Sequence, residues 1–184
     1  MKKLLLSTLT GVAMMMTLSN LSAQTVTSSG TMTVTAAIDP TISLTFASDA
    51  SGLALSSGTG TSTATLAFGH ISAYGYSAPS GVTQTVNGTA GSATAFAVAT
   101  PFDVLVMEAN SSSTNYTLTA ELNSADTTNT WTIDGTTVTS GSPASITASG
   151  TYDSAGSHTL KVSIPFTNTS GSINNAINFV ATAN

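Results

Sequence analysis

The residues of this chain that could do chemistry are two histidines, eight carboxylates and many hydroxyls. A zinc site needs three or four His, Cys or carboxylate ligands close together. His70 follows Phe68-Gly69 at the end of a predicted strand and His158 closes a predicted loop from Asp153, so we expect both to be solvated loop residues. No G-x-S-x-G turn positions a serine nucleophile. We therefore predict no catalytic residue, no cofactor and no metal ligand.

Two groups of acidic residues could be catalytic or calcium-binding, but their positions favour an ordinary structural role. Glu108 and Glu121 have the carboxylates that glycoside hydrolysis uses, but we expect them at exposed ends of neighbouring strands. Asp49, Asp126 and Asp153 lie in loops rich in Ser, Asn and Gly, without the spacing of a dedicated calcium loop. Weak calcium binding in these loops stays open.

The first residues predict export. Lys2 and Lys3 precede a mostly apolar run, and Leu21-Ser22-Ala23 offers small residues for cleavage. Residues 1–23 are therefore predicted to be a signal peptide, followed by a single domain over 24–184. No later run is long and apolar enough to span a bilayer, so we expect no membrane insertion after cleavage. The predicted location is the periplasm, the cell surface or the extracellular space.

Charge and cysteine content exclude several classes of function. Removal of residues 1–23 leaves one cation, Lys161, against eight acids, a formal charge of −7. Nucleic acids and anionic lipids are bound through Lys and Arg, so neither is an expected partner. The chain has no cysteine, which excludes disulfides and thiol chemistry.

Alternation of apolar and hydroxyl residues dominates the chain. Thr31 to Ala47 places its apolar residues at even positions, interrupted at Pro40, which predicts strands over 31–38 and 41–47. Asp134-Gly135 between two β runs predicts a tight hairpin over 131–138. Similar runs predict further strands at 63–69, 82–86, 94–100, 102–106, 116–122, 144–149, 160–166 and 173–181, and the last two should form a terminal hairpin. About ten short strands favour an all-β fold, an immunoglobulin-like antiparallel β-sandwich, with a jelly roll as the alternative.

Aromatic residues suggest one binding surface. Tyr74 and Tyr76 lie two apart in a glycine-flanked segment and are candidates for a surface contact with extracellular glycan. Trp131 could join them, but we expect it to anchor the core beside its hairpin.

Two motifs resemble a known family. Val34 to Thr45 reads V-T-A-A-I-D-P-T-I-S-L-T, and Leu66 to Ile71 reads L-A-F-G-H-I. With the signal peptide, they resemble a family of bacterial exported domains of unknown function, related to fimbrial subunits and spore coat protein U-like proteins. The resemblance implies an immunoglobulin-like fold and surface-filament subunits of the chaperone–usher type, with a periplasmic chaperone as a partner. The cysteine pair of fimbrial subunits and their penultimate aromatic residue are absent.

The leading hypothesis is an exported, non-enzymatic structural subunit of a bacterial surface filament or surface layer. Its partners would be copies of itself or related subunits. The polar start at Gln24 and the alternating residues Met32, Val34, Ala36 and Ile38 predict a segment that completes another chain's sheet. The same residues could instead pair within their own chain as an ordinary first strand. The alternative function is an adhesive or carbohydrate-binding module that uses Tyr74 and Tyr76.

Overall fold

The computed structural model describes residues 29–36, 42–56, 59–74, 77–89, 92–109, 112–168 and 171–184. The chain divides into two units, Met1–Ala37 and Ile38–Asn184, which we describe separately. In the first unit, residues 29–36 form neither helix nor strand. Their apolar side chains are exposed, with Met32 at 87% and Val34 at 82%.

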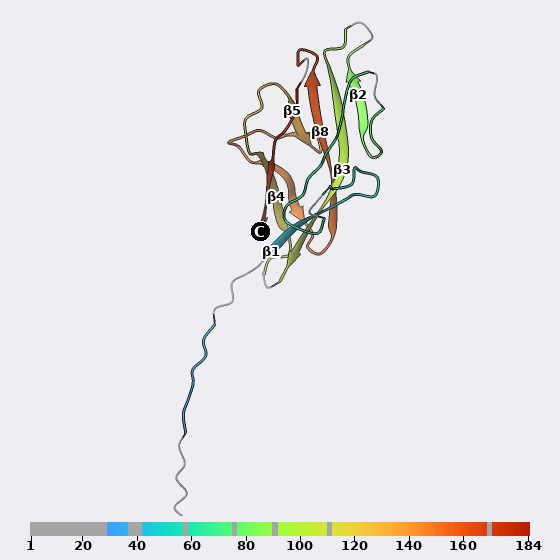
Figure 1. Cartoon of the computed structure of the whole chain (residues 1–184). Coiled ribbons are helices and arrows are strands. Elements are labelled where there is room, and N and C mark those ends of the chain that lie inside the picture. Colours follow the sequence, from blue (N-terminus) through green and yellow to red (C-terminus); the bar gives the residue numbers. More distant parts are fainter. Residues whose placement is uncertain are drawn as a thin grey trace, which may run out of the picture. The chain divides into compact units, whose positions relative to one another are not determined.

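The second unit is built on a large antiparallel sheet in the order β1-β3-β8-β5-β6, with β2 also paired to β3 (Figure 1). Alternation of apolar and small polar residues gives each central strand one face for the core and one for water. The strands are β1 Ile42–Ala47, β2 Thr83–Asn87, β3 Ala95–Glu108, β5 Thr130–Ile133, β6 Thr136–Thr137 and β8 Ala155–Pro165.

A smaller antiparallel sheet, in the order β7-β4-β9, completes the fold. Its strands are β7 Ala144–Gly150, β4 Tyr116–Leu122 and β9 Ile177–Ala183. The two sheets share one core, in which Val98, Val104 and Ile133 of the large sheet meet Leu118 and Ala120 of β4. The described part of the second unit is therefore an all-β sandwich, as predicted.

Local sequence patterns are confirmed where they specify both strand and turn. Along β8, Leu160 and Val162 are buried and Lys161 between them is exposed. In the predicted hairpin, Asp134 and Gly135 have φ values of 52° and 83°. A type I′ turn requires positive φ at both central residues, which explains this dipeptide.

Two predicted strands are wrong in the described residues. Residues 31–36 of the predicted strand 31–38 are in no strand, and residues 37–41 lie outside the described residues. Residues 63–69 also form no strand, although Leu66 and Phe68 are half-buried against the core. Alternation determines which side chains face inward, whereas a strand also needs a neighbour to accept its backbone hydrogen bonds.

Pro101 does not divide its segment into two strands as predicted. It lies inside β3, which is continuous over Ala95–Glu108. On one edge of β3, β2 pairs with residues 95–99 and β1 with residues 103–108. Pro101 lies in the gap between these two partners, so its missing N–H removes no hydrogen bond to either of them.

Two further predictions are corrected near the C-terminus. The last two strands form no hairpin, because β8 belongs to the large sheet and β9 to the small one. His158 is a buried strand residue rather than a solvated loop residue. The strand β8 begins at Ala155 and is paired with β3 through His158, whose register partner is Phe102.

Candidate functional site

His158 and Asp134 form a close pair of ionisable side chains. His158 Nδ1 lies 2.6 Å from Asp134 Oδ2, and the Thr159 backbone N–H donates to Asp134 Oδ1 at 2.7 Å. The hairpin turn holds Asp134 over the end of β8, where the His158 ring also lies against Phe102, with ring centroids 5.9 Å apart. This pair fastens the hairpin to the neighbouring strand.

The His158–Asp134 pair is not joined by a serine nucleophile from its own strand. Consecutive residues of a strand face opposite sides, and the Ser157 hydroxyl instead donates to Asp49 Oδ2 at 2.8 Å. Among the described residues, no three His, Cys, Asp or Glu side chains come together to hold a metal ion.

Glu108 and Glu121 do not lie on neighbouring strands, which corrects the prediction. Glu108 ends β3 in the large sheet, and Glu121 lies on β4 in the small sheet. Glu121 Oε1 accepts a 2.6 Å hydrogen bond from the Gly141 backbone N–H. Glu121 thus holds the loop at Gly141 to β4.

Trp131 is a core residue, as expected, and it is held by a carboxylate. Its side chain is buried, and its indole N–H donates to Asp126 Oδ2 at 2.8 Å. Burial raises the pKa of Asp126, but hydrogen bonds from the Asn129 backbone, the Trp131 indole, the Asn129 side chain and the Thr128 backbone outweigh it. The resulting pKa is about 2.

Asp126→Asn should lower the free energy of unfolding by about 1–2 kcal/mol at neutral pH, because one carboxylate oxygen is replaced by a donor facing donors. The lowered pKa of Asp126 makes its contribution present above 3.8 and lost as pH falls toward about 2. The difference between variant and parent in urea unfolding, followed by Trp131 fluorescence, should therefore shrink in acid. A difference that is independent of pH would contradict this role.

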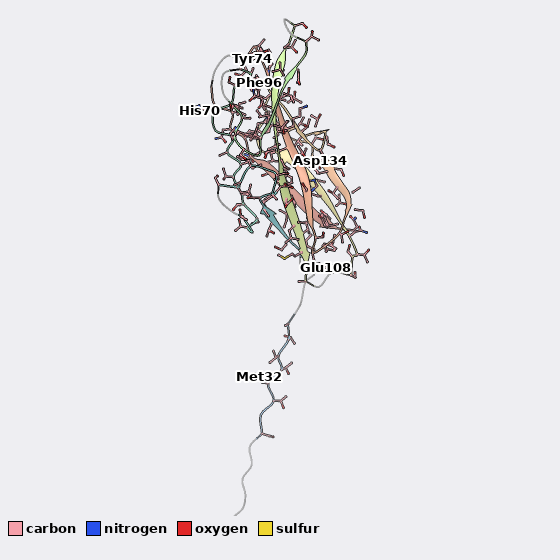
Figure 2. The ribbon with its side chains drawn as sticks, turned by 90° about the vertical axis from the view of Figure 1, so that its right-hand side faces the viewer. Met32, His70, Tyr74, Phe96, Glu108 and Asp134 are labelled. Atoms are coloured by element: carbon pink, nitrogen blue, oxygen red, sulfur yellow. The ribbon has the colours of Figure 1, made fainter. Side chains whose placement is uncertain are left out.

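The structure describes one of the two tyrosines predicted to form a surface contact. Tyr74 is 73% exposed, and Figure 2 shows it near His70 at one end of the sandwich, with Glu108 at the opposite end. Tyr76 lies outside the described residues. Burial of Trp131 removes it from any glycan platform.

Two shallow hollows mark the outer face of the large sheet. One, of about 470 Å³, is lined mainly by hydroxyls together with Asp134 and Lys161. The other, of about 420 Å³, is lined by Ser51, Thr83 and small residues of β3. Neither contains an aromatic side chain, so neither offers the stacking surface expected for sugar binding.

Two strand edges without a strand partner among the described residues form a further candidate site, and the outer edge of β9 is the first of them. Thr182 pairs with Thr117 of β4, and the Asn184 N–H donates to the Asn115 carbonyl at 3.1 Å. The even-numbered residues of β9 thus direct their backbone groups toward β4. Ile177, Phe179 and Ala181 direct theirs to the other edge, where no strand of the described chain pairs.

The outer edge of β1 is the second of these two strand edges. The Phe46 N–H donates to the Thr61 carbonyl at 2.9 Å, away from β3, so Ile42 and Leu44 also direct backbone groups away from β3. No strand of the described residues pairs with β1 at that edge. The Phe46 and Phe179 rings meet edge-on with centroids 5.3 Å apart, which brings the two open strands together. We call this pair of strands the edge site.

The edge site combines backbone and apolar features. Its inward side chains are half-buried and pack against the core: Ile42, Leu44, Phe46, Ile177, Phe179 and Ala181. Neither strand contains a charged residue or a proline. Natural sheets usually protect an edge with Lys, Pro or a bulge, so these edges have none of the sequence features that prevent pairing.

Sequence reasoning predicted donor residues but did not predict the two open edges. The side chains of Met32, Val34 and Ala36 are exposed, whereas Ile38 lies outside the described residues. Runs such as Ile42–Ala47 and Ile177–Ala183 identify strands, but only the pairing partners reveal which edge stays open. The lack of charge on both runs was the one available signal.

Within the described part of the chain, no helix has the length and hydropathy that crossing a bilayer requires. Comparison with known proteins gave no matching family model, no match among curated proteins and no match among solved structures.

Proposed function

We propose that this protein is an exported, non-enzymatic structural subunit, and that copies assemble when residues 24–38 of one chain pair with the edge site of another. The proposal rests on the adjacent strands β1 and β9, whose outer edges have no strand partner among the described residues. An added strand would satisfy backbone groups there and cover the half-buried apolar residues.

The N-terminal segment has the length and chemistry to be that strand. If fully extended, residues 24–38 would span about 50 Å, about twice the length of the seven-residue strand β9. The segment carries no acidic side chain, so an acidic domain does not repel it. Met32, Val34 and Ala36 share one side of an extended chain and would fill the apolar side of the edge site, leaving Thr33 and Thr35 facing water.

Assembly of this kind is directional. Each subunit would donate one segment and accept one segment, so the contact is head-to-tail and produces a filament unless the ring closes. Export after cleavage at residue 23 and an immunoglobulin-like arrangement of the sheets belong to the same proposal.

Complementary variants test the proposal. Val34→Asp places a charge on the apolar side of the donor segment, and Ala181→Pro removes an N–H from the open edge of β9 without removing one from its ladder with β4. Each variant alone should remain monomeric in sedimentation velocity at concentrations where the parent assembles. An equimolar mixture should form a dimer and stop, because only one functional donor and one functional acceptor remain.

Matched controls distinguish strand donation from general charge or folding effects. Thr35→Asp adds the same charge on the water-facing side and should leave assembly intact. If the parent stays monomeric at high concentration and Val34→Asp destabilises the isolated chain, the segment pairs within its own chain and strand donation is wrong.

A further inference from the structure

Two aspartates meet where β1 ends. Asp103 of β3 lies between Ala47 of β1 and Ser157 of β8 on the outer face of the large sheet. Asp49, just after β1, accepts a 2.8 Å hydrogen bond from the Ser157 hydroxyl. Its other oxygen accepts from the Ser51 backbone N–H at 2.7 Å and from the Ser51 hydroxyl at 2.6 Å. Asp49 is therefore bonded to the serine that is the register partner of Asp103, and the two carboxyl groups interact with each other directly.

Two other ionisable groups lie near this pair. His158 on β8 interacts with Asp103 electrostatically, and Asp134 in the β5–β6 turn is bonded to His158. Lys161 lies further along β8, and its register partner is Ala99. Among the described residues, no Lys or Arg forms a salt bridge with either aspartate.

We propose that Asp49 and Asp103 form a latch that closes in mild acid, when one shared proton joins the two carboxyl groups and holds the loop after β1 against β3 and β8. At neutral pH both groups carry charge, and their repulsion loosens the loop. The latch concerns the stability of the isolated chain and does not depend on strand donation.

The pKa values of the two aspartates are shifted in opposite directions, as this arrangement requires. Burial, followed by the charge of Asp49, raises the pKa of Asp103 above 3.8. Hydrogen bonds, first from the Ser51 hydroxyl, then from the Ser51 backbone and Ser157, lower the pKa of Asp49 below 3.8. The proton therefore resides on Asp103, and Asp49 is the acceptor.

The signs define the pH window. The raised pKa of Asp103 gives a stabilisation that is complete below pH 3.8 and lost as pH rises through its folded value. The lowered pKa of Asp49 gives one that is present above 3.8 and lost as pH falls through its folded value. Both are largely retained just above pH 3.8, so the latch is tightest in mild acid and opens toward neutrality.

The loop contains its own reporter. The Leu53 backbone N–H donates to Thr100 Oγ1 at 2.7 Å, which ties the loop to buried Thr100 of β3. Amide hydrogen exchange at Leu53 should therefore measure opening of the latch. The Asn129 amide, bonded to Asp126 elsewhere in the sandwich, serves as the remote reference.

The test compares the mature chain with Asp103→Asn, in which the amide imitates the protonated acid. The measured quantity is the protection of the Leu53 amide in the variant divided by that in the parent at the same pH. At neutral pH this ratio should be several-fold, and it can reach about tenfold for each unit by which the pKa of Asp103 is raised. In mild acid the two proteins should converge. Asp153→Asn removes the same charge from an exposed turn and should leave the ratio near unity throughout.

Two results would overturn the latch. One is a Leu53 ratio between Asp103→Asn and the parent that does not change with pH. The other is a carbon NMR titration of Asp103 in the unmodified chain with no raised pKa, or with a raised pKa that Asp49→Asn leaves unchanged. The titration needs no folded Asp103 variant, so it decides the matter even if that variant folds poorly.

Discussion

Ile164→Ala should lower the free energy of unfolding by about 2–5 kcal/mol, the range for removing a large buried aliphatic side chain. Ile164 is only 3% exposed and lies in the core shared by the two sheets. Its strand β8 is paired on both sides, with β3 and β5, so the backbone has little freedom to collapse into the cavity. Urea unfolding of the mature chain measures the loss.

Lys161→Ala is the matched control on the same strand. Lys161 is exposed on the outer face, and exposed substitutions usually change stability by less than about 0.5 kcal/mol. Equal losses in the two variants would mean that the inward and outward faces of β8 are wrongly assigned.

The same strand shows what a sequence can predict. Alternation from Leu160 to Ile164 and the Asp134-Gly135 turn are local features, and each specifies its structure within a few residues. Local patterns therefore predicted the all-β class, the central strands and the hairpin that carries Trp131.

Non-local pairing limited the rest. Residues 63–69 alternate as a strand does, and their apolar side chains are half-buried, yet they form no strand. β9 follows β8 in the chain but pairs with β4 in the other sheet. Nothing within either segment states which neighbour it will have, so sheet membership could not be predicted.

The candidate site depends on that missing information. Met32, Val34 and Ala36 were predicted as donor residues from alternation alone. Their acceptor depends on two open edges, and the Asp49–Asp103 pair depends on a loop meeting β3 and β8. Both are products of tertiary pairing between residues distant in sequence, and neither leaves a motif.

Gly52→Ala should lower the free energy of unfolding by about 2–4 kcal/mol, about 1–3 from overpacking and about 1 from a weakened hydrogen bond. A Cβ at Gly52 would overlap the Pro101 carbonyl oxygen and lie 3.0 Å from its carbonyl carbon. These are backbone atoms of β3, which is paired with β8 at Pro101, so they cannot move aside as a flexible side chain could. The loop must shift instead, which strains the hydrogen bond from the Leu53 N–H to Thr100.

Gly156→Ala separates this clash from the general effect of replacing glycine. A Cβ at Gly156 would lie 3.5 Å from His158 Nε2 and 3.8 Å from the Val104 carbonyl oxygen, both ordinary contacts. Its backbone is in β8 and not in the left-handed region, so alanine should be neutral or stabilising by about 0.4–1 kcal/mol through the unfolded chain. The midpoint of thermal unfolding should therefore fall in Gly52→Ala and should rise or stay unchanged in Gly156→Ala. If Gly52→Ala proved as stable as the parent, the loop would not be seated on β3, and the Leu53 reporter of the latch would lose its structural basis.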